Sequence, residues 1–327
     1  MRNLLLKAAE RVLTGTISPQ RVSFPADSAG MDFTGERYVP GVAGQIKFEH
    51  LHRYLLSVEY AHHRDVLDIA SGEGYGTASL ASVAKRVVGV DISMEAVAHA
   101  NRRYGSENLS FKHGSIATIP ADDKSFDLVV CFETLEHIGD QAKALAELRR
   151  VLRPDGLLII STPNIAAEDG ALHEANPFHE KELTEEELRA LIMPQFQNYV
   201  FYEQRFTHGS IIATQDSGSS GMQLVTSVKE NVYDVTNTDL GKNYFIVLAS
   251  NSPLPPLNRV SLFDGSQELK SLHKDFTYAV STMHSLEAEN AELKAQIARL
   301  QTNVDLHRIQ IDFLRKKLKL SVTNVGS

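Results

Sequence analysis

The stretch 65–81 constrains the fold of this chain more than any other part of its sequence. It begins with an apolar run, 65–70, that carries one acid, Asp68, and has the composition of a buried parallel strand. Helix-forming residues end the stretch, and between the two stand glycines at every second position: Gly72, Gly74 and Gly76. Such a turn brings backbone N–H groups close to a ligand, because glycine has no Cβ. A tight turn without a ligand would use the same glycines, so other residues have to identify the ligand.

Two acids indicate which ligand fits this turn. The spacing Gly-x-Gly-x-Gly differs from the Gly-x-Gly-x-x-Gly fingerprint of nicotinamide enzymes, and Asp68 would repel a pyrophosphate. A carboxylate at this place suits a cationic amino group instead. A second apolar strand, 86–91, ends in Asp91, about twenty residues further on, where an acid can hold a ribose diol. The two carboxylates therefore fit an adenosyl ligand with a cationic amino-acid tail.

These residues, together with the stretch 126–137, resemble the class I S-adenosylmethionine-dependent methyltransferases over about residues 35–249. The resemblance implies that the glycine turn holds the methionine part of the cofactor and that Asp91 holds the ribose. The alternatives are a dehydrogenase and a Rossmann domain that binds no cofactor. The implied cofactor-binding residues are Asp68, Ala70, Ser71, Gly72, Gly74, Tyr75, Asp91, Ile92, Ser115, Ile116, Phe132 and Glu133.

The sequence departs from the family pattern at two of these positions. Ala70 stands where the family has the first glycine of the turn, which adds a Cβ. Ser115 stands where an acid commonly contacts the adenine amine, so Ser115 or the backbone of Ile116 would have to make that contact.

Strands and helices alternate between residues 64 and 162. The expected strands are 64–70, 86–91, 109–113, 126–132 and 156–162, and the expected helices are 75–84, 93–103 and 139–152. This alternation predicts an α/β fold with a doubly wound parallel sheet. A helix near 184–193 and a strand near 198–206 follow, and strand 243–249 is expected to be the antiparallel edge strand. The stretch 153–156 is predicted to be a turn in which Gly156 takes a positive φ.

Composition changes along the chain predict five segments. Residues 1–33 form an amphipathic helix, 4–13, with a polar connector, and residues 34–250 form the methyltransferase domain. Residues 215–221 are expected to be a loop within it. A proline-containing linker, 251–268, precedes a coiled coil, 269–320, and a short tail, 321–327.

The stretch 126–138 carries the candidate catalytic groups. Glu133, Glu136 and His137 form an E-x-x-E-H pattern, and on a helix they would share one face. With His179, they could hold a divalent cation. This pattern is similar to that of ubiquinone-biosynthesis O-methyltransferases and small-RNA 2′-O-methyltransferases, some of which use a metal. In the alternative that we favour, no metal binds, Glu133 contacts the cofactor or the fold, and His137 is a general base or substrate contact.

A helix from residue 49 carries two further histidines. His50 and His52 cannot lie on one face, so at most one of them points into a site. The candidate catalytic residues are His137, Glu133, His179 and His52. A base would assist methylation of a sugar hydroxyl, a poor nucleophile until its proton is removed, whereas a carboxylate or phosphate acceptor would need none.

Several motifs together are similar to those of bacterial methyltransferases of surface-polysaccharide and O-antigen synthesis. They lie at 35–40, 49–54, 72–76, 133–138 and 176–179. The resemblance implies O-methylation of a sugar hydroxyl in a glycan or nucleotide-sugar precursor, and a glycosyltransferase as partner. The alternatives are a small-molecule or quinone O-methyltransferase and a coiled-coil scaffold with a degenerate methyltransferase fold.

The overall composition argues against some functions. The formal net charge is -8, and a nucleic-acid enzyme would usually show a basic footprint. The single cysteine, Cys131, excludes an intrachain disulfide and is expected to be an inert core residue. No signal peptide or membrane-spanning run is recognisable. We therefore expect a cytoplasmic protein, peripheral to the inner membrane only through partners.

The C-terminal segment has a heptad pattern. The d positions are Leu286, Leu293, Leu300, His307 and Leu314, and the a positions are Asn290, Ile297, Val304, Ile311 and Leu318. Isoleucine and valine at a, with leucine at d, favour two parallel strands, in which Asn290 would face its own copy. The pattern predicts a parallel homodimer. A single long helix that folds back on its own domain is the alternative.

Overall fold

The computed structural model describes residues 38–42, 44–165, 178–205, 224–229, 232–236, 243–254 and 266–323, and four single residues: Val22, Phe24, Met31 and Phe263. Only the backbone is described for 224–229, 232–236, 266–273, 275 and 318–323. The predicted helix 4–13, the loop 215–221 and parts of the motifs at 35–40 and 176–179 lie outside these residues. The chain divides into two compact units, residues 1–261 and 262–327.

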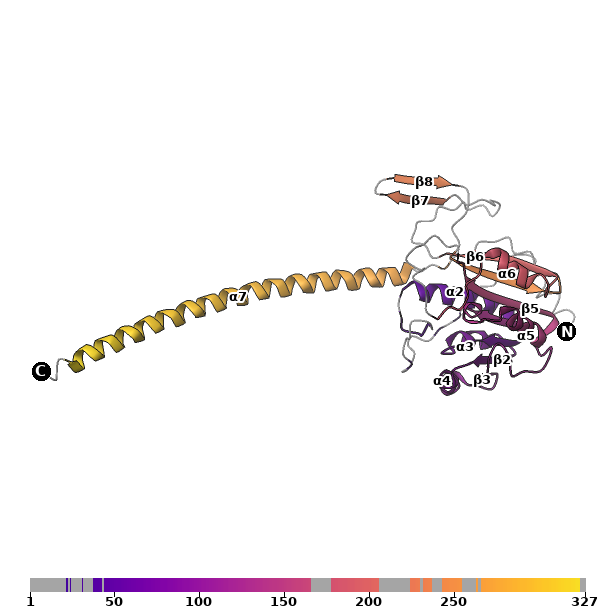
Figure 1. The fold of residues 1–327 in the computed structure, drawn as a ribbon, viewed down its shortest axis with the longest axis horizontal. Coiled ribbons are helices and arrows are strands. Elements are labelled where there is room, and N and C mark those ends of the chain that lie inside the picture. Colours follow the sequence, from indigo (N-terminus) through magenta and orange to yellow (C-terminus); the bar gives the residue numbers. More distant parts are fainter. Residues whose placement is uncertain are drawn as a thin grey trace. The chain divides into compact units, whose positions relative to one another are not determined.

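A mixed sheet of seven strands forms the centre of the first unit (Figure 1). Its order is β3-β2-β1-β4-β5-β9-β6, and the first five strands are parallel. The strands are β1 (Asp65–Ile69), β2 (Arg86–Asp91), β3 (Leu109–His113), β4 (Phe126–Phe132), β5 (Leu152–Pro163), β6 (Asn198–Gln204) and β9 (Tyr244–Ser250). A separate hairpin pairs β7 (Leu224–Lys229) with β8 (Val232–Thr236). The predicted doubly wound α/β fold is confirmed.

The position predicted for the antiparallel strand at the edge of the sheet is wrong. β9 runs antiparallel to both of its neighbours and lies between β5 and β6, so β6 forms the edge. The burial of the two strands explains this order. β9 is buried along almost its whole length, whereas most of β6 is only half-buried, and an apolar run needs neighbours on both sides.

The helices cover both faces of the sheet. α3 (Tyr75–Ala81) contacts both α2 (Gln45–Ala61) and α4 (Met94–Tyr104), and α5 (Gln141–Val151) contacts α6 (Glu185–Ile192). The strand order reverses between β1 and β4. Right-handed crossovers on the two sides of this point place α3 and α5 on opposite faces. Local capping fixes three helix starts, at Ser93, at Asp140 and at the Thr184–Glu187 capping box.

Successive side chains of β1 point to opposite faces of the sheet, one towards the hydrophobic core and the other towards α2 and α3. Leu67 and Ile69 belong to the main hydrophobic cluster, which also contains Leu145 and Leu148 of α5. Asp68 lies on the other face, where its side chain reaches residues of α2 and α3. The buried thiol of Cys131 belongs to the core cluster, and burial raises its pKa, as expected for an inert cysteine.

The predicted turn at 153–156 is instead a bulge within β5. Phe126 of β4 pairs with Leu152, but Leu128 pairs with Leu157, so β5 advances five residues while β4 advances two. Gly156 has no positive φ, contrary to the prediction. A Cβ on Gly156 would lie 2.7 Å from Leu152 Cδ1, so the Leu152 side chain would have to shift to accommodate it.

The second unit contains one continuous helix, α7 (Ser266–Thr323) (Figure 1). Its 58 residues correspond to a length of roughly 90 Å. Within the described residues, none of the helices is both long and apolar enough to cross a membrane. The predicted helix is confirmed, and the residues with described side chains at the predicted a and d positions are all exposed.

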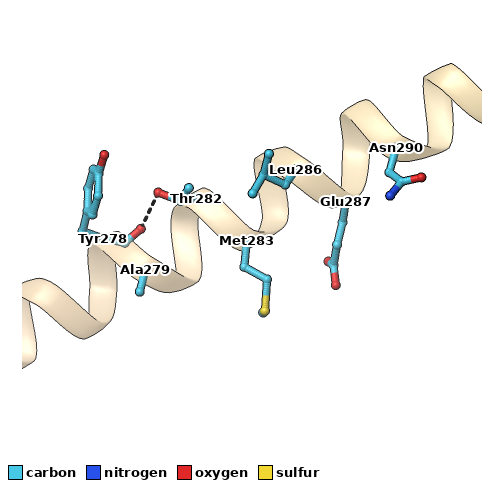
Figure 2. Close-up of a pocket in the computed structure, with 7 residues that line it drawn as sticks. All are labelled: Tyr278, Ala279, Thr282, Met283, Leu286, Glu287 and Asn290. Carbon is cyan, nitrogen blue, oxygen red and sulfur yellow. Dashed lines mark hydrogen bonds between the residues drawn. The ribbon is translucent and has the colours of Figure 1, made fainter.

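The apolar stripe of α7 extends towards its N-terminus, within the predicted coiled-coil segment 269–320. Ala279, Met283, Leu286 and Asn290 follow one another at intervals of three and four residues (Figure 2). Together with Tyr278, Thr282 and Glu287 they line a hollow of about 470 Å³ on a single helix. Met283 and Leu286 of this hollow are half-exposed or more.

Candidate functional site

The glycine turn lies at the carboxyl end of β1, where the strand order reverses and open α/β sheets bind their ligands. Gly72 and Gly74 have φ values of 58° and 98°, which other residues rarely adopt. A Cβ on Gly74 would also lie 2.8 Å from the Cβ of Ala100. Ala70 has a φ of 58° as well, so the departure from glycine at this position is a strained residue.

Asp91 at the end of β2 is joined directly to the glycine turn. Its Oδ2 accepts the N–H of Gly72 at 2.8 Å, and its Oδ1 accepts the N–H of Ser93 at 2.9 Å. Ile92, the next residue, exposes 72% of its surface, so a large apolar side chain stands in water beside the acid. A carboxylate flanked by an exposed apolar side chain suits a ribose and its base.

On the adenine side, Ser115 and Ile116 lie in the loop after β3. The hydroxyl of Ser115 accepts the N–H of Ala117 at 3.2 Å and so closes its own loop. Ile116 is buried. The backbone of this loop is therefore the better candidate for an adenine contact.

Asp68 lies beneath the turn and is fully buried. Its Oδ2 accepts the hydroxyl of Thr77 at 2.6 Å and that of Tyr54 at 3.1 Å. Burial raises the pKa of Asp68 to about 7, although the two hydroxyl bonds act in the opposite direction. Asp68 therefore connects α2 and α3 to the end of β1, and a nearby cation would favour its ionised form.

Aromatic residues of α2 and the segment before it cover the glycine turn. The ring of Tyr75 lies 5.4 Å from that of Tyr54 and 5.0 Å from that of Tyr38, and its hydroxyl is 3.2 Å from Nδ1 of His50. A Cβ on Gly76 would lie 2.0 Å from the ring of Tyr54, so only glycine lets α2 approach this closely. Tyr75 is consequently a packing residue of the turn.

Glu73 was not predicted as a site residue, and its side chain is fully buried. It accepts the hydroxyl of Tyr104 at 2.9 Å and lies 2.8 Å from Nε2 of His99, both on α4. Burial raises the pKa of Glu73, and these hydrogen bonds oppose that effect. Its position between two glycines was the only sequence signal for a role in fixing the turn.

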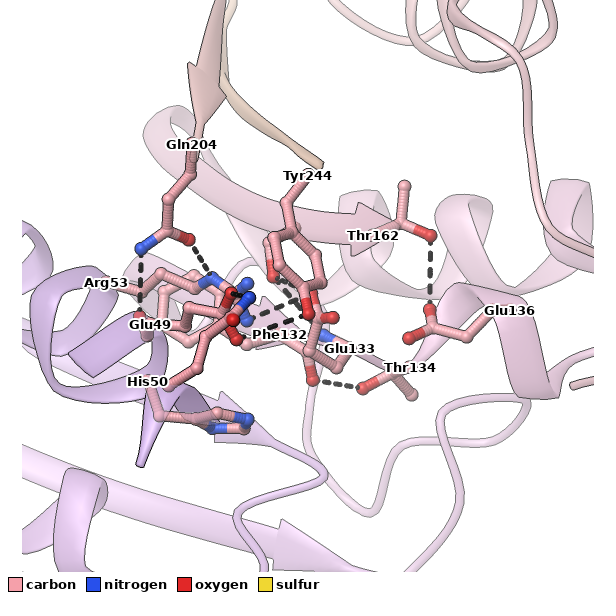
Figure 3. A network of polar contacts seen from close by, with 12 residues as sticks. Glu49, His50, Arg53, Phe132, Glu133, Thr134, Glu136, Thr162, Gln204 and Tyr244 are labelled. Carbon is pink, nitrogen blue, oxygen red and sulfur yellow. Dashed lines mark hydrogen bonds and ion pairs between the residues drawn. The ribbon is translucent and has the colours of Figure 1, made fainter. Parts of the chain in front are cut away.

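The E-x-x-E-H stretch does not form the helical face on which its metal interpretation depended. Glu133 has a φ of 46°, and only Leu135–His137 form a short 3-10 turn, η1. Figure 3 shows the result: Glu133 contacts the network around Arg53, whereas Glu136 contacts Thr162 at 3.1 Å. The prediction that Glu133 shares a face with Glu136 and His137 is wrong, because the strand end rotates Glu133 away.

Glu136, His137 and His179 do come together. One ligand atom from each lies within 4.8 Å of the others, and the two imidazole rings have centroids 4.9 Å apart. Nδ1 of His137 lies 2.9 Å from the carbonyl of Phe178, and Nδ1 of His179 lies 2.6 Å from Oε1 of Glu182. Since a carbonyl only accepts, Nδ1 of His137 must carry the hydrogen, which leaves the lone pair of the neutral ring on Nε2.

This cluster could hold a divalent cation, with the Nδ1 contacts orienting the rings as in known metal sites. Burial raises the pKa of Glu136 well above its ordinary value, and Glu133 adds to the effect.

His52 lies on α2 and is half-buried. Burial and then Arg53 lower its pKa. The structure therefore groups His137 with His179 and pairs Glu133 with Arg53, whereas His52 is only the neighbour of Arg53 along α2.

Comparisons with known proteins show which sequences this chain resembles. The model of a family described as "Methyltransferase domain" matches residues 67–160. A probable S-adenosylmethionine-dependent methyltransferase of Mycolicibacterium smegmatis is 36% identical over 214 residues, which are 63% of this chain and 80% of the relative. One of Mycobacterium tuberculosis is 39% identical over 171 residues, 51% of this chain and 62% of the relative. A demethylmenaquinone methyltransferase of Clavibacter sepedonicus is 36% identical over 104 residues, 31% of this chain and 42% of the relative.

Proposed function

This chain belongs to the S-adenosylmethionine-dependent methyltransferases, and we propose that it transfers the methyl group of that cofactor to a hydroxyl of a sugar. The acceptor would be part of a surface glycan or of its nucleotide-sugar precursor. The motifs at 35–40, 49–54 and 176–179, which resemble those of surface-polysaccharide methyltransferases, support this choice.

The observation that carries the proposal is the orientation of His137. Its Nδ1 donates to the carbonyl of Phe178, so Nε2 is the basic atom of the ring. The residue lies just beyond the end of β4, which neighbours β1 and its glycine turn. A base at this place serves a hydroxyl acceptor, whereas an acceptor that is already an anion would not need one.

The reaction assigns a role to each part of the site. Bound S-adenosylmethionine supplies a methyl group activated by the sulfonium. The glycine turn and Asp91 would hold the cofactor, and hydrogen bonds to Asp68 and Glu73 fix the ends of that turn. His137 would accept the proton of the acceptor hydroxyl as that oxygen receives the methyl group.

A panel of acceptors tests the proposal. Labelled S-adenosylmethionine would be incubated with nucleotide sugars, lipid-linked glycans and phenols, and the labelled product identified. We expect transfer to a sugar hydroxyl, with a loss of at least a hundredfold in His137→Ala. Transfer to phenols alone would replace the sugar proposal by a quinone-type activity, to which the name of the Clavibacter relative points. That relative matches only 31% of this chain.

The cluster of Glu136, His137 and His179 raises metal dependence as a second question. Only three of the four expected ligands come together, because Glu133 pairs with Arg53. We therefore expect methyl transfer to persist in excess chelator and elemental analysis to find no bound metal. Loss of activity that Mg²⁺, Mn²⁺ or Zn²⁺ restores would show instead that the three side chains bind a cation.

The exposed seam of α7 supports a parallel homodimer through about residues 269–318. Two copies would bury Leu293, Ile297 and Leu300, which are now about half-exposed or more. In the parallel register, Glu289 at g faces the partner's Lys294 at e, an attractive pair. Residues 34–250 would then be the catalytic domain and 251–268 the linker.

A glycosyltransferase of the same glycan is the further partner we propose, and it would keep a cytoplasmic enzyme near the inner membrane. A scaffold that no longer binds cofactor is the competing function. Titration with S-adenosylmethionine separates the two, because a scaffold would give no binding. The retained Asp68, glycine turn and Asp91 favour an enzyme.

A further inference from the structure

One arginine of the candidate site is almost completely buried. The side chain of Arg53 on α2 is 1% exposed, and its Nε donates to Oε1 of Gln204 at 2.6 Å. Its guanidinium carbon lies 4.3 Å from the centre of the Tyr244 ring, and Nη1 lies 3.1 Å from Oε1 of Glu133 (Figure 3). A buried cation is costly unless it is paired, and a set of well-packed apolar side chains in place of a whole buried ion pair is often at least as stable. Packing alone therefore does not account for an arginine here.

Glu133, the ionic partner of Arg53, makes two contacts through the same carboxylate oxygen, Oε1. Oε1 of Glu133 also accepts the hydroxyl of Ser161 at 2.6 Å, and no described residue makes a hydrogen bond to Oε2. The backbone of Glu133 is in the left-handed region, and its N–H donates to the carbonyl of Ser161 at 3.2 Å. Such a conformation persists only where the surroundings impose it. The side chain keeps 18% of its surface exposed, so Oε2 can reach a ligand.

Arg53 itself is fixed by a second layer of contacts. Gln204, which accepts from Nε, donates to the carbonyl of Glu49 at 3.1 Å, and the hydroxyl of Tyr244 donates to the carboxylate of Glu49 at 3.2 Å. These residues come from α2, β6 and β9. The terminal nitrogens Nη1 and Nη2 make no hydrogen bond with good geometry, although Nη1 is in ionic contact with Glu133. The guanidinium is thus held by the hydrogen bond from Nε to Gln204, by the ring of Tyr244 and by the charge of Glu133. Its contact with Glu133 can become shorter when a ligand binds.

The location of Glu133 indicates which ligand its second oxygen meets. Ile69 of β1 pairs with Cys131 of β4, so Glu133 and Ser71 each lie two residues beyond a paired position. Glu133 therefore stands beside the glycine turn, at the end where a cofactor's amino-acid part binds. S-adenosylmethionine carries its positive charges, the ammonium and the sulfonium, at that end, and a carboxylate attracts them.

We propose that Arg53 is a positioning residue that holds one oxygen of Glu133 so that the other faces the cationic end of S-adenosylmethionine. This inference depends on the cofactor and not on the identity of the acceptor. A failure of the sugar proposal would leave it unaffected.

Calorimetric titration with S-adenosylmethionine tests the proposal on the full chain. Glu133→Gln and Arg53→Met should each weaken binding about tenfold. The Kd of the double variant for S-adenosylmethionine should exceed the larger Kd of the two single variants by at most threefold, because both changes remove the same contact. Arg53→Lys keeps the charge but not the fixed geometry and should recover part of the affinity, and it replaces Arg53→Met if that variant does not fold.

Arg153→Met is the matched control. Arg153 pairs with Asp65 and Asp127 at the opposite ends of β1 and β4, so its loss should lower Tm and leave cofactor affinity within twofold. Folded Arg53 variants that bind S-adenosylmethionine as tightly as the unchanged chain would overturn the proposal. Losses that multiply in the double variant would overturn it too, because they would show that Arg53 and Glu133 act independently.

Discussion

Leu158 in β5 and Leu300 in α7 are the same residue in opposite environments: the first is 0% exposed and the second 63%. Full burial of one leucine contributes about 1.5–3 kcal/mol to folding. In the first unit, sheet and helices supply that burial from within one chain. In α7 the apolar positions repeat along one stripe, and the described side chains at its a and d positions are exposed. If two copies pair through α7 as proposed, the stability of that helix should depend on protein concentration, whereas that of the first unit should not.

The two units differ equally in their charged groups. The first unit buries Asp68, Glu73, Glu136 and Arg53 at the carboxyl ends of its strands, and each has a named contact. Along α7 the described charged side chains are all exposed. Buried charges are costly and mark the site, whereas exposed charges on a helix only choose its partner and register. Experiments that separate the two units test this difference most directly.

The largest expected effect comes from ending the chain after Pro256. If the seam of α7 alone holds two copies together, the shortened chain should be a monomer that still binds S-adenosylmethionine with a Kd within about threefold. Light scattering and calorimetry measure the two properties. A full-length chain that is monomeric at micromolar concentration would contradict the dimer, as would a dimer that survives the truncation.

The next effect concerns a buried acid of the first unit. The pKa of Asp68 is raised to about 7 in the ligand-free protein, against about 3.9 in an unfolded chain. Below pH 4 the carboxyl is protonated in both states. As the pH rises to about 7, the carboxyl releases its proton in the unfolded state but keeps it in the folded state. The free energy of unfolding therefore falls by at most about 4 kcal/mol.

Asp68→Asn removes this group, so its free energy of unfolding should fall less between pH 4.5 and 7.5 than that of the unchanged chain. Urea unfolding at several pH values without cofactor measures the difference. Parallel pH dependences for the two proteins would show that Asp68 does not titrate in this range.

A smaller effect is expected from Asp91→Ala. Hydrogen bonds to a charged group contribute about 1.5–3 kcal/mol, so the affinity for S-adenosylmethionine should fall at least tenfold. Because Asp91 also accepts the N–H of Gly72, Tm should be measured in parallel. Unchanged affinity in a folded variant would remove the ribose assignment. Oligomeric state should not change, which keeps this effect within the first unit.

The smallest effect is expected from Asn290→Ile in α7. An amide pair buried in a seam lowers stability but disfavours trimers and shifted registers, which would leave an amide unpaired. The variant should therefore melt a few degrees higher, as followed by its helical circular dichroism, and should populate additional oligomers in light scattering. A lower Tm with an unchanged dimer would show that Asn290 lies outside the seam.

The sequence by itself determined whatever depends on neighbours along the chain. The apolar runs predicted the parallel strands, the alternate glycines predicted the turn, and the heptad pattern predicted α7 as a helix. Asp91 could be placed near the turn because both follow neighbouring parallel strands, and their hydrogen bond agrees with that reasoning. These features are local or periodic, and short-range geometry fixes them.

Only the tertiary structure decided which distant side chains meet. Arg53 contacts Gln204, 151 residues away, and no periodic pattern in the sequence predicts such a pair. The interior place of β9 and the bulge before Gly156 likewise depend on how strands compete for neighbours. Glu133 does not share a face with Glu136, because the chain turns sharply at the end of β4. The positive φ of Glu133 changes the direction of the chain that follows it.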